Sequence, residues 1–359
     1  MKSTLSVHLA LRLLPSSLLL LAVTHVGAAT PVPNAEGEVI PPDEPAAITA
    51  VAKAIQASVQ AGFDKTGHAY RDAHRKAHGC VHATFSVLPG LPSKVAQGLF
   101  AQPQSYEAVI RFSNGSGQSL DDHSNDARGM ALKVLGVPGT KVLSDELDAR
   151  TQDFVMTNHP VFFIRNAPDY VAFQKAVSGG GLTQAGWFAQ HLFYEVPIIV
   201  AFTGHKVTNP LNSRYWSATP SKLGTEQMKF SAKPCAGGTF VSTSDTVNLL
   251  AENLQGQLNS QSACFDFMVQ TRTVSAQMPI EDPTVEWKEA SSPFIPVAKI
   301  QIDPQTVENG EACEVRSFTP WHTLPEHRPL GGISRVRKVV YQAISTQRHQ
   351  LNGQPRVEP

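Results

Sequence analysis

The segment LGGISRVRKVVYQAISTQRHQ, residues 330–350, places a phenol between two guanidinium groups. Arg337, Tyr341 and Arg348 are spaced at i, i+4 and i+11, which puts them within about 40° of one another on a helix. Arg337, one turn from Tyr341, can hydrogen-bond the phenolate, and its positive charge favours the ionised form. A phenolate is a hard anionic ligand that suits ferric iron. The pattern therefore indicates an iron-binding helix face; the alternative is a solvated basic helix whose tyrosine packs against the protein.

A histidine-containing segment, HGCVHATF at residues 78–85, alternates like a strand. His82 would share one strand face with Cys80 and Thr84. It could be a catalytic base, a metal ligand or a hydrogen-bonded histidine with no catalytic role. Upstream, His74 and His78 at i, i+4 would form a metal-binding face if a helix continued that far. Gly79 argues against a helix reaching His82, and the HExxH pattern of zinc proteases is absent.

Polar side chains in VIRFSN and TNHPVFFIRN are a third candidate set. Arg111 and Ser113 share a strand face because they are two residues apart. Asn158 ends a predicted strand just before Pro160, where a side chain can project into a cavity and both donate to and accept from a small polar ligand. The alternative is that Asn158 only caps a turn.

The elements that must position these residues alternate between two periodicities. Apolar residues at steps of three and four predict a helix from Ala46 to about Lys76, with Asp43 as its N-cap. Period-two segments predict strands at CVHATFSV, YEAVIRFSN, RGMALKVLG, TQDFVMT, EQMKFSAKP, ACFDFMVQTRT and FIPVAKIQI. Further helices are predicted at residues 167–178, 184–202, 246–258 and in the last segment. Many antiparallel strands with inserted and C-terminal helices predict an α+β fold with a β-barrel core.

The first 29 residues are typical of a secretory signal peptide. Lys2 and Arg12 precede an apolar run that ends in small residues at Ala29, and the run is shorter than a membrane-spanning helix. We therefore expect an exported protein, periplasmic or secreted, without stable membrane insertion; an uncleaved anchor is the alternative. Residues 30–45 are rich in proline and acidic residues and predict an extended arm or linker before a single domain at 46–359.

Charge and cysteine content restrict the remaining possibilities. The 359-residue chain has 30 Lys plus Arg and 30 Asp plus Glu, so no excess charge favours nucleic acid as a partner. Four scattered cysteines (Cys80, Cys235, Cys264 and Cys313) do not form a CxxC motif, so a thiolate metal site is not favoured. In an exported chain they predict one or two structural disulfides, and three pairings are open.

Five motifs taken in order resemble the haem catalase superfamily. The series is VHATF, IRFSNGSG, DARGMALKV, FVMTNHPVFFIRN and RKVVYQAISTQR. It is similar to that family's distal-histidine strand, Arg-Phe-Ser strand, Arg-Gly-x-Ala-Leu-Lys strand, Asn-x-Pro-x-Phe-Phe segment and proximal Arg-x-x-x-Tyr helix. The segments CFDFMVQTRT and MPIEDPTVEWKEASSPFIPVAKIQI resemble those of the shorter catalase-related peroxidases.

The resemblance implies a cofactor and its binding residues. The cofactor would be haem (heme, iron protoporphyrin) with a tyrosinate ligand, Tyr341, hydrogen-bonded by Arg337. Distal His82 and Asn158 would be catalytic. Three more residues complete the implied set: Arg111 and Arg348 at the propionates, and Ser113 next to the histidine.

The activity that the resemblance implies is decomposition of hydrogen peroxide, or of organic hydroperoxides, in oxidative-stress defence. A small-molecule electron donor would be a partner in peroxidase turnover, and a homo-oligomer is expected from the family. The alternatives are a haem isomerase or lyase of lipid hydroperoxides, and a haem-binding barrel without turnover.

Two departures from the longer catalases are visible in the sequence. Gly79 stands three residues before His82, at the place where those enzymes carry a propionate-binding arginine. The chain also lacks the length for their wrapping and C-terminal helical regions, so we do not expect their interlocked tetramer.

Overall fold

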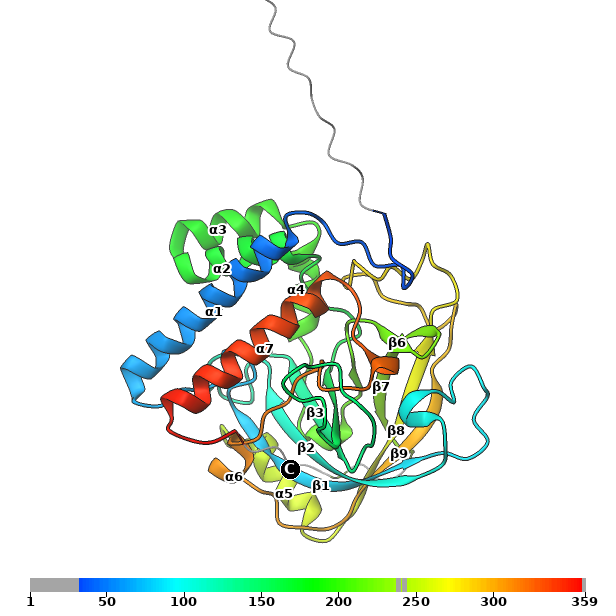
Figure 1. Ribbon diagram of the computed structural model, residues 1–359. Helices are drawn as coiled ribbons and strands as arrows, with labels where there is room; N and C mark the ends of the chain where they lie inside the picture. Colours follow the sequence, from blue (N-terminus) through cyan, green and yellow to red (C-terminus); the bar gives the residue numbers. More distant parts are fainter. Residues whose placement is uncertain (1–31, 237–239, 241–243, 357–359) are drawn as a thin grey trace, which may run out of the picture. The chain divides into compact units, whose positions relative to one another are not determined.

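Antiparallel strands form the framework of the computed structural model, which describes residues 32–236, 240 and 244–356 (Figure 1). The strands are β1 (Ala77–Val87), β2 (Ser105–Asn114), β3 (Arg128–Leu135), β4 (Thr151–Thr157), β5 (Tyr215–Trp216), β6 (Ser221–Leu223), β7 (Glu226–Pro234), β8 (Ala263–Thr271) and β9 (Ile295–Ile302). The predicted signal peptide, residues 1–29, lies outside the described residues.

Eight of the strands close into a barrel in the order β5-β4-β3-β2-β1-β9-β8-β7, and a pairing between β5 and β7 completes the ring. β5 is short: Trp216 pairs with Thr157 of β4 on one side and with Ser231 of β7 on the other. The strand β6 extends the sheet next to β7. The predicted α+β fold with an antiparallel barrel core is confirmed.

Period-two alternation produces the barrel core, because alternate side chains of each strand point inward. In β1, Val81 and Phe85 are fully buried whereas His82 and Thr84 are exposed. Aromatic rings from several strands meet inside; for example, the Phe154 and Phe267 ring centroids lie 4.8 Å apart. Such ring pairs add to the stability that burial supplies.

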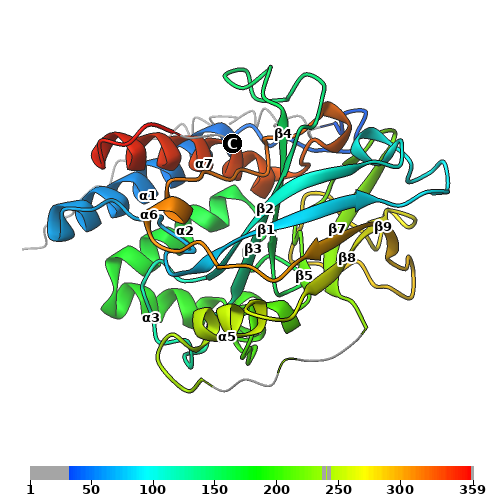
Figure 2. The ribbon, with the colours of Figure 1, turned by 90° about the horizontal axis from the view of Figure 1, so that it is seen from below.

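Seven helices and three short 3-10 turns lie among the described residues. The helices are α1 (Glu44–Thr66), α2 (Ala167–Gly179), α3 (Gly181–Gln190), α4 (Glu195–Thr203), α5 (Leu249–Leu258), α6 (Glu311–Glu314) and α7 (Gly332–Leu351). The 3-10 turns are Gly98–Phe100, Pro210–Asn212 and Pro325–His327. Figures 1 and 2 show α1 and α7 side by side next to one end of the barrel. None of the helices in this part of the chain is long and apolar enough to cross a membrane.

Two helix boundaries differ from the sequence prediction. α1 ends at Thr66, not near Lys76, because Gly67 takes a left-handed conformation (φ 69°) and its N–H caps the carbonyl of Phe63. The predicted helix at 184–202 is broken into α3 and α4, with a turn between them. The first difference matters most, since it leaves the segment before β1 outside any helix.

Two disulfides cross-link the structure. Cys80 pairs with Cys313 and Cys235 pairs with Cys264. The prediction of one or two structural bridges is confirmed, and the structure selects one of the three pairings that the sequence left open. Cys80 is in β1 and Cys313 in α6, so the first bridge attaches α6 to the barrel wall.

Candidate active site

His74 lies in the irregular segment between α1 and β1. Its Nδ1 is 2.9 Å from the backbone oxygen of Asn114 and 3.1 Å from Ser113 Oγ. Because a carbonyl oxygen can only accept, Nδ1 carries the proton and donates it there. Nε2 is therefore the nitrogen with a free lone pair, which is the arrangement that a general base requires.

The environment of His74 keeps its imidazole neutral. Burial and the nearby charge of Arg111 lower its pKa to about 4, with smaller contributions from Arg337 and Arg71, whereas the hydrogen bond to Asn114 opposes the shift. At neutral pH the ring can thus accept a proton. The backbone of His74 also has φ 59°, an unusual left-handed conformation for a residue other than glycine.

Gly129 in β3 allows the ring of His74 to approach the barrel wall. A Cβ atom at Gly129 would lie 2.5 Å from His74 Nδ1 and 2.8 Å from Ser113 Oγ. Both distances are below any real carbon contact, so only glycine leaves the imidazole in this position.

Asn158 follows β4 and is 3% exposed. Its Oδ1 accepts a hydrogen bond of 2.7 Å from the backbone N–H of Arg128 in β3, so it joins two strand ends and does not merely cap its own turn. Its Nδ2 is buried without a hydrogen-bond partner in the described structure. Since a buried unpaired amide is unfavourable, Nδ2 is suited to bind a ligand atom.

The predicted tyrosine face is present on α7. Arg337 Nη2 donates to Tyr341 Oη at 3.4 Å, and its guanidinium lies 5.4 Å from the centre of the Tyr341 ring. Val336 and Ile344 of the same helix pack in the apolar cluster that α1 shares. The charge of Arg337 contributes to the low pKa of His74, which places the α7 face within electrostatic reach of that imidazole.

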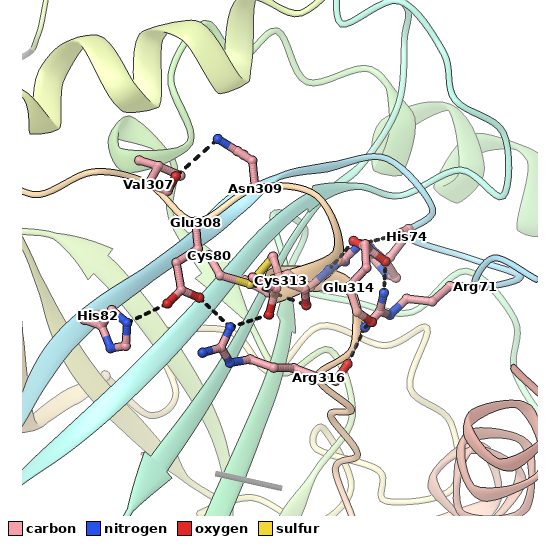
Figure 3. Close-up of a disulfide and its surroundings, with 12 residues drawn as sticks. Arg71, His74, Cys80, His82, Val307, Glu308, Asn309, Cys313, Glu314 and Arg316 are labelled. Atoms are coloured by element: carbon pink, nitrogen blue, oxygen red, sulfur yellow. Dashed lines mark hydrogen bonds and ion pairs between the residues drawn. A yellow bond between two sulfur atoms is a disulfide. The ribbon is translucent and has the colours of Figure 1, made fainter. Parts of the chain in front are cut away.

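Three guanidinium groups meet beside this site, and we call Arg71, Arg111 and Arg348 the arginine cluster. All three donate to or pair with Glu314 at the end of α6. Figure 3 shows Arg71 next to Glu314. Arg111 Nη2 lies 2.7 Å from one carboxylate oxygen of Glu314 and also donates to the backbone oxygen of His74 at 2.9 Å. The predicted residues Arg111 and Arg348 are therefore brought together, and Arg111 connects the cluster to His74.

The structure does not bring His82 together with the other predicted residues. Its side chain is 60% exposed on the outer face of β1, and its Nε2 lies 2.9 Å from Glu308 Oε1. Figure 3 shows His82 with Glu308 on one side of the Cys80–Cys313 disulfide, and His74 with Glu314 on the other. The expected placement of His82 next to Ser113 is thus corrected: alternation along β1 turns it away, and His74 takes that position.

Arg71 was missed and His74 was considered only as one of a metal-binding pair, because the predicted first helix extended over both. The signal that could have found them is the spacing, since Arg71 stands three residues before His74. Gly79 stands at the same spacing before His82, where the resemblance to the longer catalases implies an arginine.

These residues fit a haem. Tyr341 with Arg337 supplies a phenolic oxygen donor, His74 presents a free imidazole nitrogen, and Asn158 has an unpaired buried amide. The arginine cluster suits carboxylates, which guanidinium groups bind through paired hydrogen bonds. One feature differs from an open propionate site: Glu314 already lies among the three arginines.

No family model matches the sequence, but individual proteins do. Catalase A of Pseudomonas putida is 23% identical and Catalase of the Onchocerca volvulus endobacterium 22%, each over 292 residues that cover 74% of this chain. The chain spans 58% of the length of both relatives.

Solved structures agree with the sequence relatives. Catalase A from Saccharomyces cerevisiae superposes with a TM-score of 0.62 at 19% identity, covering 81% of this chain and 64% of that one. A fungal catalase gives a TM-score of 0.61 at 18% identity, covering 82% and 63%. The chain has the catalase fold, and the predicted resemblance to the haem catalase superfamily is confirmed in sequence and in fold.

Proposed function

We propose that the protein is a haem-dependent catalase or peroxidase that decomposes hydrogen peroxide in oxidative-stress defence. The observation that carries the proposal is His74, a neutral imidazole with Nδ1 fixed and Nε2 free, within electrostatic reach of the Arg337–Tyr341 pair. The catalase names of its relatives support the same reaction. The two disulfides support export, in accord with the predicted signal peptide at residues 1–29.

When bound, haem supplies the redox-active iron that the chain itself lacks. Tyr341 would be the iron ligand, with Arg337 donating to its oxygen and stabilising the phenolate. The arginine cluster would hold the propionates. Ser113 and the backbone oxygen of Asn114 fix the imidazole of His74.

His74 carries out the proton transfers. Its Nε2 accepts a proton from one oxygen of hydrogen peroxide and returns it to the other oxygen, which leaves as water. Asn158 Nδ2, otherwise unpaired, donates a hydrogen bond that orients the peroxide between these two steps. A second peroxide, or an organic electron donor, completes the turnover.

The test compares His74→Gln, His82→Gln and Tyr341→Phe with the wild type, all expressed with haem supplied. We expect His74→Gln to lower peroxide consumption about 100-fold or more, because positioned acid–base groups contribute roughly that much. His82→Gln, the matched surface control, should keep nearly full activity. Tyr341→Phe should change the absorption spectrum of the bound haem, because it removes the phenolate oxygen.

Oxygen evolution and donor oxidation, measured in parallel, separate catalase from peroxidase turnover. Full activity in His74→Gln would refute its role as the base. Absence of haem from wild-type protein folded with haem present would refute the proposed function as a whole.

A further inference from the structure

The arginine cluster has more positive charge than its one carboxylate can balance. The cations are Arg71, Arg111 and Arg348, with side-chain exposure of 15% and 3% for the first two and a residue exposure of 4% for the third. Glu314 is the single acidic partner within salt-bridge distance of this cluster among the described residues. Burial favours the neutral form of Glu314, but the charges of Arg71 and Arg111 outweigh it and lower its pKa.

The Glu314 carboxylate occupies donors of Arg71 and Arg111 that an incoming carboxylate would also use. Arg111 donates to Oε1 through Nη2 at 2.7 Å and Nε at 3.2 Å, while Arg71 pairs with Oε2. Arg348 Nη1 donates to the backbone oxygen of Glu314 at 2.6 Å. A free carboxylate bound by two arginines would make the same pattern.

The chain holds Glu314 there with covalent and backbone restraints. Cys80 is directly opposite Arg111 in the pairing of β1 with β2, and the disulfide joins Cys80 to Cys313, the residue before Glu314. Cys80 and Glu308 also exchange two backbone hydrogen bonds of 2.8 and 2.9 Å. The backbone that carries the Glu314 side chain is therefore fixed next to Arg111. Binding of this carboxylate to the arginine cluster then costs little conformational entropy.

We propose that Glu314 is a built-in competitor for the carboxylate site of the arginine cluster, and that haem binding requires exchange of this side chain for a propionate. The proposal rests on the proposed haem-binding function. Both groups are carboxylates, and Arg71 and Arg111 cannot bind two of them with the same nitrogens. Glu314 thus sets the affinity of the protein for porphyrins that have propionates.

The test is titration of haemin into haem-free protein, followed by the Soret absorbance band, for the wild type, Glu314→Gln and Glu311→Gln. Glu311 is an exposed acid on the same helix, so its variant removes an equal charge without touching the cluster. We expect Glu314→Gln to bind haemin about tenfold more tightly or better and Glu311→Gln to match the wild type. Haemin dimethyl ester, which lacks free propionates, should bind the wild type and Glu314→Gln equally.

An equal or weaker affinity of folded Glu314→Gln for haemin would overturn the proposal, while haemin binding by the wild type would leave the proposed function standing. If no variant binds haemin, both fail. Because Glu314→Gln could lose stability, the crystal structure of the wild type with haemin is the second measurement. Glu314 displaced from Arg71 and Arg111 supports the exchange, and Glu314 still between them refutes it.

Discussion

At the scale of single residues, the position of the imidazole depends on groups that have no catalytic chemistry themselves. His74 adopts a left-handed backbone conformation, and Ser113 with the Asn114 carbonyl fixes its ring. Gly129 leaves the space in which that ring lies. A backbone conformation of this kind persists only when the surrounding structure imposes it.

Replacing Gly129 with alanine should therefore displace His74. We expect peroxide consumption to fall by about 100-fold, since a misplacement of about 1 Å can have that effect on a catalytic group. The Soret band should remain, because Gly129 is not placed at Tyr341. Gly62→Ala is the control, since a Cβ there meets no atom within 4 Å. Unchanged turnover in Gly129→Ala would contradict the role given to His74.

At the scale of elements, one arginine of α7 connects three separate segments. Arg335 pairs with Glu38 of the N-terminal arm at 2.7 Å, with Glu44 at the start of α1 at 2.5 Å, and with Glu281 of the segment between β8 and β9 at 3.0 Å. Burial opposes its charge, but the hydrogen bonds that Arg335 donates to Glu44 and Glu281 raise its pKa. The network fixes the helix that positions Tyr341.

Arg335→Leu should destabilise the protein strongly, because it leaves the nearly buried carboxylate of Glu44 without its cation. We expect the free energy of unfolding to fall by about 3–5 kcal/mol, measured by urea denaturation. Lys94→Leu breaks an exposed pair with Glu226, whose atoms are 3.9 Å apart, and should cost less than about 1 kcal/mol. Equal losses in the two variants would show that the network is not a source of stability.

The same elements show how far the sequence can predict such a protein. Alternation revealed the strands and helical spacing revealed the face with Arg337 and Tyr341, because both are local patterns. The end of α1 depended on one glycine cap, which the apolar spacing did not reveal, while the motif VHATF directed the histidine prediction to His82. The place of Glu314 depends on a disulfide across a sequence separation of 233, which no local pattern contains.

At the scale of the whole molecule, buried histidines couple folding to pH. Burial lowers the pKa of His327 from 6.5 to about 4, and the pKa of the buried His78 is lowered in the same way. The unfolded chain binds protons at these positions below pH 6.5 while the folded chain does not. The free energy of unfolding therefore decreases as pH falls from about 6.5 to about 4.

One buried histidine shifted this far accounts for at most about 3 kcal/mol of that loss. Urea denaturation at pH 7.5, 5.5 and 4.5 measures the slope for the wild type and for His327→Gln. We expect the variant to lose less stability between pH 6.5 and 4.5 than the wild type, whatever its stability at pH 7.5. Identical slopes in the two proteins would refute this contribution of His327.

The Cys80–Cys313 bridge gives the chain the topology of a closed loop with two free tails. The loop contains every strand from β2 to β9, whereas α1 and α7 belong to the tails. Chain entropy in the unfolded state is thus reduced for the barrel and not for this helix pair. Partial unfolding would therefore separate Tyr341 from the barrel while the barrel itself stays closed, so the helix with the proposed iron ligand can leave and return without the rest of the fold being rebuilt.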